Sequence, residues 1–296
     1  MEALSITGLC KSFGANLVIN DISFDVPMGS IFGFIGANGA GKTTTMNMAL
    51  GFLESDSGQI FICGERVAYG KTAKSVGYLP DVPEFYNYMR PKEYLKLCGE
   101  LSGMSATKIK KRGSELLEIV GLEGINRKIG GFSRGMKQRL GIAQALLGDP
   151  NLLICDEPTS ALDPIGRKEI LDILTAVKTT VIFSTHILSD VERICDHAAI
   201  LHNGKIALYG TLADLKKRKT DSYAVEFASA QEAADFSDIL MKVKEGGKVG
   251  VTENTVIFND ANGGELLAIL AEQKLVPVKF ELLEPTLESL YLEVAA

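Results

Sequence analysis

The chain has 296 residues, of which 46% are hydrophobic and 23% are charged, a composition typical of a globular protein. Its length predicts two domains, or one large domain with an appendage. Its formal net charge of −6 argues against a general nucleic-acid binder, which usually presents a basic surface.

Short β-rich segments, separated by Gly, Asn and Pro, open the chain and predict strands. We expect these strands at residues 4–9, 22–26, 30–35, 59–63 and 76–79, with a helix at 43–51. Between residues 91 and 147 the apolar residues recur instead at the spacing of one helix face. The pattern therefore predicts an α/β core with a helical subdomain at about residues 90–148.

The α/β pattern resumes after this helical segment, and the tail then has a different rhythm. In the core we expect strands at 152–155, 180–184, 198–201 and 205–209, and helices at 164–177 and 187–195. In the tail we expect strands at 223–228 and 276–282, a hairpin at 248–258, and helices at 231–242, 264–274 and 287–294. The tail pattern predicts a small α+β domain.

The charge distribution separates the same two regions. Residues 1–219 carry 26 basic and 23 acidic side chains, a net charge of +3, whereas residues 220–296 carry 5 basic and 14 acidic side chains, a net charge of −9. This shift predicts a domain boundary near residue 220. The adjacent run Lys216-Lys217-Arg218-Lys219 is expected to be the solvated end of a helix.

The cysteines and the amino-terminal residues indicate in which cellular compartment the chain is expected. The cysteines, Cys10, Cys63, Cys98, Cys155 and Cys195, include no C-x-x-C pair, so we expect no disulfide framework or zinc site and a reducing compartment. The first residues lack a basic region followed by an apolar stretch, and no apolar run approaches the roughly 18 residues of a membrane helix. We expect a soluble chain that could still bind a membrane protein.

The stretch GANGAGKT, residues 36–43, matches the phosphate-binding pattern G-x-x-x-x-G-K-[ST] between an expected strand and an expected helix. Glycines let successive backbone N–H groups point at a β-phosphate, and the following helix adds its positive end. Lys42 would reach the β- and γ-phosphates, and the Thr43 hydroxyl would bind Mg²⁺. The alternative is an ordinary glycine-rich turn.

Two further strands end in polar residues. The apolar run at 152–155 predicts a buried parallel strand, and Asp156 follows at the end where open α/β sheets bind ligands, so it suits a magnesium shell. Glu157 is placed to polarise a water for attack on a γ-phosphate, unless it belongs to a simple acidic turn. His186 follows the expected strand 180–184 and is predicted to be functional, with a capping or packing role as the alternative.

The ordered motifs GANGAGKT, FSRGMKQR, LLICDEP, SALD and STH closely resemble the ATP-binding subunits of ABC transporters over about residues 1–215. The tail, ending in LEPTLESLYLEV, is similar to the accessory domain of exporter ATPases of the bacitracin-resistance, daunorubicin-resistance and sodium-efflux type. The resemblance implies an α/β P-loop NTPase core with an N-terminal β subdomain and a helical insertion in residues 1–219. It also implies a small α+β accessory domain in residues 220–296.

The resemblance implies an enzyme that binds and hydrolyses ATP with Mg²⁺ and drives a separate membrane permease, as an exporter. The chain would then be cytoplasmic and peripheral on the inner face of the membrane. The implied nucleotide-binding residues are Phe13, Gly36, Ala37, Asn38, Gly39, Ala40, Gly41, Lys42, Thr43 and Thr44. Phe13 falls where the family stacks an aromatic ring on adenine, whereas an apolar core residue is the alternative.

The resemblance also implies a dimer. The signature loop contains Ser133, Arg134, Gly135 and Met136, and in the family this loop faces the γ-phosphate bound to the other subunit. Ser133 and the Gly135 backbone would donate hydrogen bonds there, and the following helix would point its positive end at the phosphate. Ser160, Ala161, Leu162 and Asp163 look like the D-loop that bridges the subunits, and His186 falls on the histidine that senses the γ-phosphate. The implied dimer would form on ATP binding, as a homodimer or as a heterodimer with a similar subunit.

The sequence departs from the family pattern at three positions. Arg134 and Met136 replace Gly and Gln of the usual LSGGQ signature, while Ser133 and Gly135 remain. Asp81 stands where a glutamine is usual; an aspartate can still reach Mg²⁺, directly or through a water. It is shorter, however, and adds negative charge near the residues that follow strand 152–155.

Three aromatic residues follow Asp81 in a Pro-containing loop. The resemblance implies that Phe85, Tyr86 and Tyr88 contact the permease, because the family receives a short permease helix at this edge of the helical subdomain. Local packing under the loop is the alternative.

Other functions would use the same phosphate loop. A non-transport ABC ATPase acting on DNA or ribosomes usually has two cassettes or basic segments, whereas this chain has one cassette and an acidic tail. A P-loop kinase would not need the signature loop or the D-loop. A regulatory module that binds ATP but hydrolyses it poorly remains open because of Asp81.

Overall fold

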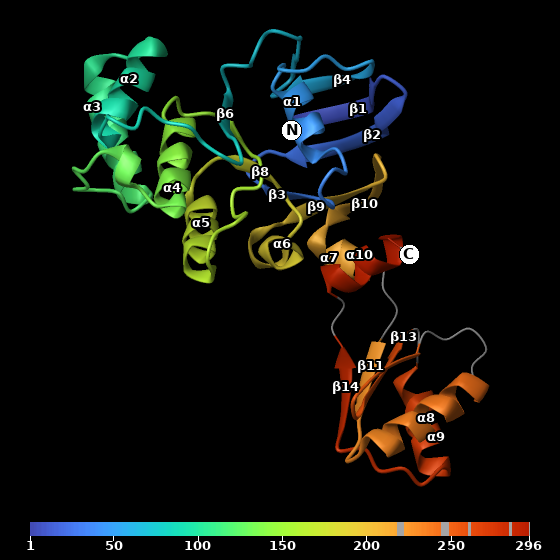
Figure 1. Ribbon diagram of the computed structural model, residues 1–296. Coiled ribbons are helices and arrows are strands. Elements are labelled where there is room, and N and C mark those ends of the chain that lie inside the picture. Colours follow the sequence, from blue (N-terminus) through green and yellow to red (C-terminus); the bar gives the residue numbers. More distant parts are fainter. Residues whose placement is uncertain (218–221, 244–248, 260–261, 284–285, 296) are drawn as a thin grey trace. The chain divides into compact units, whose positions relative to one another are not determined.

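Strand pairing begins with the first residues in the computed structural model, which describes residues 1–217, 222–243, 249–259, 262–283 and 286–295 (Figure 1). β1 (Glu2–Phe13) pairs antiparallel with β2 (Asn16–Pro27) and β4 (Ser57–Ile62), and β4 pairs with β5 (Glu65–Arg66). Ile22, Phe24 and Val26 of β2 are buried and alternate with more exposed residues, so one face of this sheet is covered.

A second sheet has the strand order β10-β9-β3-β8-β7-β6. Its strands are β3 (Ile31–Ile35), β6 (Val76–Leu79), β7 (Leu152–Cys155), β8 (Thr180–Thr185), β9 (His197–His202) and β10 (Lys205–Thr211). Neighbouring strands are parallel except β9 and β10, which are antiparallel. Every residue of β7 and β8 is buried, as expected for central parallel strands covered on both faces.

The two sheets and α1 (Lys42–Ala49) share one hydrophobic core within residues 1–212. The ring of Phe24 on β2 stacks on Phe32 and Phe34 of β3, with centroid distances of 5.6 and 5.2 Å. Met46 and Met48 of α1 complete this cluster. The core therefore fixes the end of β3 and the start of α1 in one place.

Helices separate β6 from β7 in the sequence: α2 (Pro91–Leu101), α3 (Ala106–Ile119), the 3₁₀ turn η1 (Ile129–Gly131) and α4 (Arg134–Ala145). Pro91 starts α2, and Glu93 accepts a hydrogen bond from the Arg90 N–H at 2.8 Å, which caps the helix. A Cβ atom on Gly141 would lie 2.5 Å from Cδ1 of Leu79, so glycine allows α4 to lie close against β6. This contact joins the helical subdomain (green in Figure 1) to the edge of the sheet.

Two helices follow the central strands. α5 (Pro164–Ala176) follows β7, and α6 (Leu188–Ile194) follows β8. The carboxylate of Asp190 on α6, which is 1% exposed, accepts hydrogen bonds from Arg167 of α5 at 2.5 Å and from Thr159 at 2.7 Å. These bonds compensate the buried charge and hold the segment after β7 against both helices.

The chain divides into two compact units, Met1–Leu212 and Ala213–Ala296. In the second unit the strand order is β12-β13-β11-β14, with all pairs antiparallel. The bounds are β11 (Ser222–Glu226), α8 (Ala230–Val243), β12 (Val249–Thr252), β13 (Thr255–Asn259), α9 (Gly263–Glu272), β14 (Lys279–Leu283) and α10 (Leu287–Ala295). α8 and α9 lie on one face of this sheet (Figure 1). Buried Phe227, Phe236 and Phe258 belong to one apolar cluster of this unit.

α7 (Leu212–Lys217) begins at the last residue of the first unit and continues into the second. Lys216 and Lys217 form its last turn, as the basic run predicted, whereas Arg218 and Lys219 lie outside the described residues. Among the helices in the described part of the chain, none is both long and apolar enough to cross a bilayer.

Candidate nucleotide site

A glycine-rich loop, residues 36–43, joins β3 to α1. Gly41 has a φ of +107°, and a Cβ atom there would lie 2.5 Å from Cδ1 of Ile19. Backbone conformation and space therefore both require glycine. Ala37, Asn38 and Gly39 form the exposed tip of the loop, which leads into the helix N-terminus, where unpaired N–H groups favour an anion.

Lys42 begins α1, and its side chain folds back across the loop. Its ammonium donates to the carbonyl oxygens of Gly36 at 2.7 Å and Ala37 at 3.1 Å. The same Nζ atom lies 3.0 Å from Oε1 of Glu157, and the two side chains are 6% and 13% exposed. Carbonyl dipoles and a carboxylate thus compensate the buried ammonium.

Asp156 directly follows β7, and its carboxylate is held by two hydroxyl groups. Oδ2 accepts from Oγ1 of Thr43 at 2.8 Å, and Oδ1 accepts from Oγ of Ser184 at 2.5 Å. Burial of the phenol, reinforced by the Asp156 charge, raises the pKa of neighbouring Tyr78 to about 12, so Tyr78 stays neutral at physiological pH. Thr43 and Asp156 supply converging oxygen atoms of the kind that Mg²⁺ prefers.

Glu157 has a φ of +46°, which is uncommon for a residue with a side chain. Its backbone N–H donates to Oγ of Ser184 at 2.8 Å, which fixes this turn. Its carboxylate Oε2 lies 2.9 Å from Nδ1 of His186, while Oε1 contacts Lys42. The structure therefore brings the two predicted catalytic groups and the loop lysine into direct contact.

The signature loop begins α4. Ser133 is its N-cap, and its Oγ accepts from the backbone N–H of Met136 at 3.2 Å. Ser133 and Arg134 are exposed, whereas the side chain of Met136 is 9% exposed and its sulfur accepts a hydrogen bond from Arg127. Met136 therefore contributes to the interior, whereas Ser133 and Arg134 face outward.

The predicted D-loop connects β7 to α5. Ser160 and Leu162 are half-buried, and Ala161 and Asp163 are exposed. Ala161 has a φ of +51°, which turns the chain sharply. Asp163 caps α5 by accepting a backbone hydrogen bond from the first turn of that helix at 3.1 Å.

Asp81 follows β6, but its contacts differ from those of Asp156. Its Oδ1 accepts a hydrogen bond from Oγ of Ser160 at 2.6 Å and another from Nη2 of Arg134 at 3.2 Å. The carboxylate is thus engaged with the D-loop and the signature loop.

Phe13 ends β1, and its side chain is 51% exposed. The ammonium of Lys11 lies 5.6 Å from the ring centroid, and Lys11 also pairs with Asp56 at 2.8 Å. The exposure contradicts the alternative that Phe13 is a core residue and leaves the ring accessible. Thr44, the last residue of the predicted nucleotide set, is half-buried in α1.

The aromatic loop after Asp81 divides into two parts. Phe85 is half-buried and packs edge-on against Tyr94 of α2, with a centroid distance of 5.0 Å. Tyr86 and Tyr88 are 54% and 69% exposed, and their ring centroids lie 5.9 Å apart. Local packing therefore accounts for Phe85, whereas the two tyrosines form an exposed aromatic pair.

Known proteins share this chain's sequence and architecture. Residues 19–160 match the family model described as ABC transporter. The bacitracin transport ATP-binding protein BcrA of Bacillus licheniformis is 42% identical over 222 residues, which cover 73% of this chain and 72% of that protein. The chain belongs to the ABC transporter ATP-binding proteins.

Two more ABC proteins support this assignment. The Nod factor export ATP-binding protein I of Rhizobium sp. (strain N33) is 42% identical over 209 residues, which cover 69% of each chain. The solved structure of an ATP-binding subunit of an ABC transporter aligns with a TM-score of 0.66 at 35% identity, covering 73% of this chain and 92% of that one. The predicted ABC ATPase fold and the predicted function, an ATP-hydrolysing transporter subunit, are confirmed.

Two buried polar residues of this ABC site were not identified by sequence analysis. Ser184 bonds to both Asp156 and the Glu157 backbone, and Gln138 of α4, which is fully buried, donates to the carbonyl oxygens of Asp81 at 3.1 Å and Pro158 at 3.2 Å. Both residues lie inside motifs that carried the resemblance, STH and FSRGMKQR. Membership in these motifs was the signal that the sequence offered.

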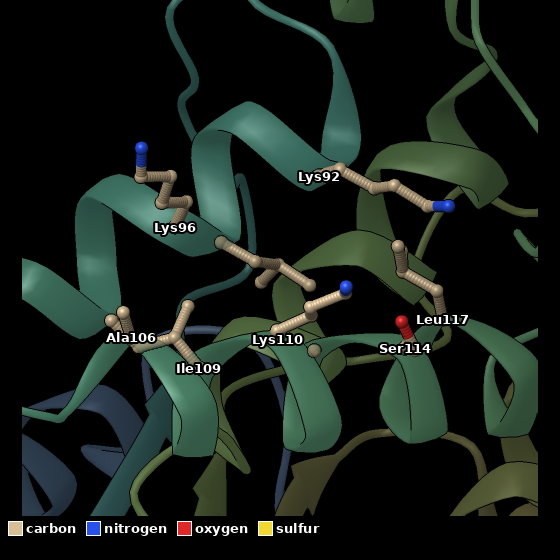
Figure 2. Close-up of a pocket in the computed structure, with 9 residues that line it drawn as sticks. Lys92, Lys96, Ala106, Ile109, Lys110, Ser114 and Leu117 are labelled. Carbon is tan, nitrogen blue, oxygen red and sulfur yellow. The ribbon is translucent and has the colours of Figure 1, made fainter.

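A pocket of about 310 Å³ lies elsewhere, between α2 and α3 (Figure 2). It is lined by apolar Leu95, Ile109 and Leu117, by Lys92, Lys96 and Lys110, and by Ala106, Gly113 and Ser114. None of the predicted site residues lines it, so this pocket belongs to the helical subdomain and not to the nucleotide site.

Replacing Ser184 with alanine is expected to weaken both stability and activity. The change leaves the buried Asp156 with one hydroxyl donor fewer and frees the strained Glu157 turn, which costs about 1–3 kcal/mol of unfolding free energy. Chemical denaturation and steady-state ATPase assays would measure the two effects. Ser189→Ala, which removes an exposed hydroxyl bonded to Arg167, is the matched control. Equal behaviour of the two variants would contradict the assigned role.

Proposed function

We propose that ATP binds with its phosphates on the 36–43 loop and that Glu157 acts as the general base. The position of Glu157 between Lys42 and His186 carries this proposal, because it puts a base, a phosphate-binding cation and a γ-phosphate sensor in one cluster. Bound β- and γ-phosphates would compete with Glu157 for the ammonium of Lys42. Glu157 would then be free to accept a proton from the attacking water, while His186 contacts the γ-phosphate.

Thr43 and Asp156 would hold Mg²⁺. Their direct hydrogen bond of 2.8 Å supports this role, because it directs a hydroxyl oxygen and a carboxylate oxygen to the same place beside the phosphate loop. Mg²⁺, when bound, offsets the negative charge that develops on the β- and γ-phosphate oxygens. Ser184 would keep the other carboxylate oxygen of Asp156 in position.

A second subunit would complete each site through its signature loop. The exposed Ser133 and the N-terminus of α4 offer a hydroxyl, backbone N–H groups and a positive helix end to the partner's γ-phosphate. A Cβ atom on Gly135 would have its closest contact at 3.9 Å, from Leu162, so packing within one chain does not require glycine here. The open space at Gly135 supports an approach to its backbone from outside the chain. The approaching group would be the ATP bound to the second subunit of a homodimer or of a related heterodimer.

The transport role would be export through a separate permease, which places the chain on the inner face of the membrane. Similarity to the bacitracin transport protein supports a transport role, and similarity to the Nod factor export protein supports this direction. Exposed Tyr86 and Tyr88 would contribute the permease contact, with Phe85 supporting the loop from beneath through Tyr94. The unit Ala213–Ala296 has its own core and would act as an accessory domain.

Replacing Glu157 with glutamine tests the base. The amide keeps the size of the side chain but cannot accept the proton, so the ATPase rate should fall by about 10²-fold or more. ATP and Mg²⁺ should then trap a dimer, visible by analytical ultracentrifugation. Identical hydrolysis and assembly in the parent chain and in E157Q would favour a regulatory ATP-binding module instead.

Replacing Ser133 with arginine tests the composite site. The bulky cation should leave ATP binding to the isolated subunit nearly intact but abolish ATP-driven dimerisation and hydrolysis. Ser105 is the matched control, because it also caps an exposed helix start in the helical subdomain, so S105R should dimerise normally. A collapse of ATP affinity in the S133R monomer would mean that Ser133 serves its own chain's site.

Replacing both Tyr86 and Tyr88 with aspartate tests the permease contact. Charged side chains would disrupt an apolar surface that receives a permease helix, so a co-purifying multi-span membrane protein should be lost while ATPase activity of the isolated subunit persists. Tyr69, which is 64% exposed and outside this loop, provides the control Y69D. Mass spectrometry of the affinity-purified complex measures the difference. Retention of the membrane protein by the double variant would reject the contact.

A further inference from the structure

The two charged departures from the usual ABC pattern meet in space. Asp81 and Arg134 lie 53 residues apart in the sequence, yet the Asp81 carboxylate accepts a hydrogen bond from the Arg134 guanidinium at 3.2 Å. Ser160 donates to the same carboxylate oxygen at 2.6 Å, and its Oγ lies 3.3 Å from Nη2 of Arg134. We call this triangle of Asp81, Arg134 and Ser160 the clasp.

A second connection lies directly beneath the clasp. Gln138 is four residues after Arg134 on α4, so the two side chains share one helix face. Its amide donates to the backbone carbonyl groups of Asp81 and Pro158, at 3.1 and 3.2 Å. One face of α4 therefore contacts both the backbone and the side chain of Asp81. The same face also contacts Pro158, before the D-loop, and Ser160, at its start.

We infer that Asp81 is a positioning residue, not a magnesium ligand, and that the clasp fixes the signature loop and the D-loop relative to each other within one chain. Ser133 is adjacent to Arg134, and Ala161 is adjacent to Ser160. Fixing the clasp therefore fixes the two segments that the proposed dimer presents to its partner. The effect of the clasp on dimerisation rests on the proposed function, whereas the clasp itself lies within a single chain.

The two departures carry opposite charges that pair with each other. Arg134 without Asp81 would place an unpaired guanidinium between two loops, and Asp81 without Arg134 would add an unpaired carboxylate at the phosphate-binding edge. Side-chain exposures of 43% and 46% make this a screened surface pair. Its expected effect is therefore on the geometry of the two loops and not on the stability of the fold.

A double-mutant cycle in the full chain tests the coupling. In an E157Q background, D81N should weaken ATP-driven dimerisation by about fivefold per clasp, and so on the order of 25-fold for a symmetric dimer that contains two clasps. D81N combined with R134Q should be no weaker than the worse single variant, because each change breaks the same interaction. The Mg²⁺ concentration for half-maximal ATP binding to the monomer should stay unchanged. Additive effects, or a tenfold or larger rise in that Mg²⁺ concentration, would overturn the inference.

Hydrogen–deuterium exchange in the chain without nucleotide separates this inference from the proposed dimer. D81N should raise amide exchange both at the start of α4 and in the D-loop, residues 160–163. The control D172N removes one partner of the similarly exposed Arg193–Asp172 pair, at 2.8 Å, and should change neither segment. Unchanged exchange in D81N would overturn the clasp, whereas absence of any ATP-driven dimer in the E157Q parent would reject the proposed function alone.

Discussion

The parallel register of β3, β8 and β7 is the constraint on which the rest of the site depends. Ile35 pairs with Thr185, and Phe183 pairs with Cys155, so the three strands end along one edge. The phosphate loop, His186 and Asp156 follow those ends directly, which brings segments distant in the sequence into one cluster. A register slip of one residue would reverse the face of every side chain on a strand, so the buried apolar runs that fix the register also fix the site.

Charges at this buried edge require local compensation. Lys42 and Asp156 are 6% and 4% exposed, and each is surrounded by partners: carbonyl groups and Glu157 for the ammonium, and two hydroxyl groups for the carboxylate. A bound phosphate would exchange with Glu157 as the partner of Lys42, so no step would leave the ammonium without a counter-charge. Such preorganised polar surroundings are what electrostatic catalysis needs, because little rearrangement accompanies the reaction.

Sequence analysis identified the site residues that lie in short motifs, and it missed the contacts between segments that are far apart in the chain. The 36–43 loop and Asp156 could be found because phosphate and Mg²⁺ chemistry depends on short spacings beside an apolar strand. β1 extends over Glu2–Phe13, beyond the expected 4–9, because pairing with β2 continues where the apolar pattern has ended. The contact between Asp81 and Arg134, and the bonds of Ser184 and Gln138, depend on packing between segments far apart in the chain, which no spacing reveals.

Helix α4 links the signature loop to the segment that follows β6. Ser133 caps its N-terminus, Arg134 begins its first turn, and its buried face holds Gln138. Its later turns lie against β6. The segment after β6 contains both Asp81 and the exposed aromatic pair, so the proposed permease contact and the proposed phosphate contact share one connected stretch of structure.

Spatial connection alone does not couple two sites; coupling needs an element with two discrete arrangements. A clasp that is formed in one arrangement of the loops and broken in another would meet this requirement. A force on the aromatic loop that moves Asp81 would therefore change how the signature loop and the D-loop are held, and the same free energy would act in reverse when ATP fixes those loops.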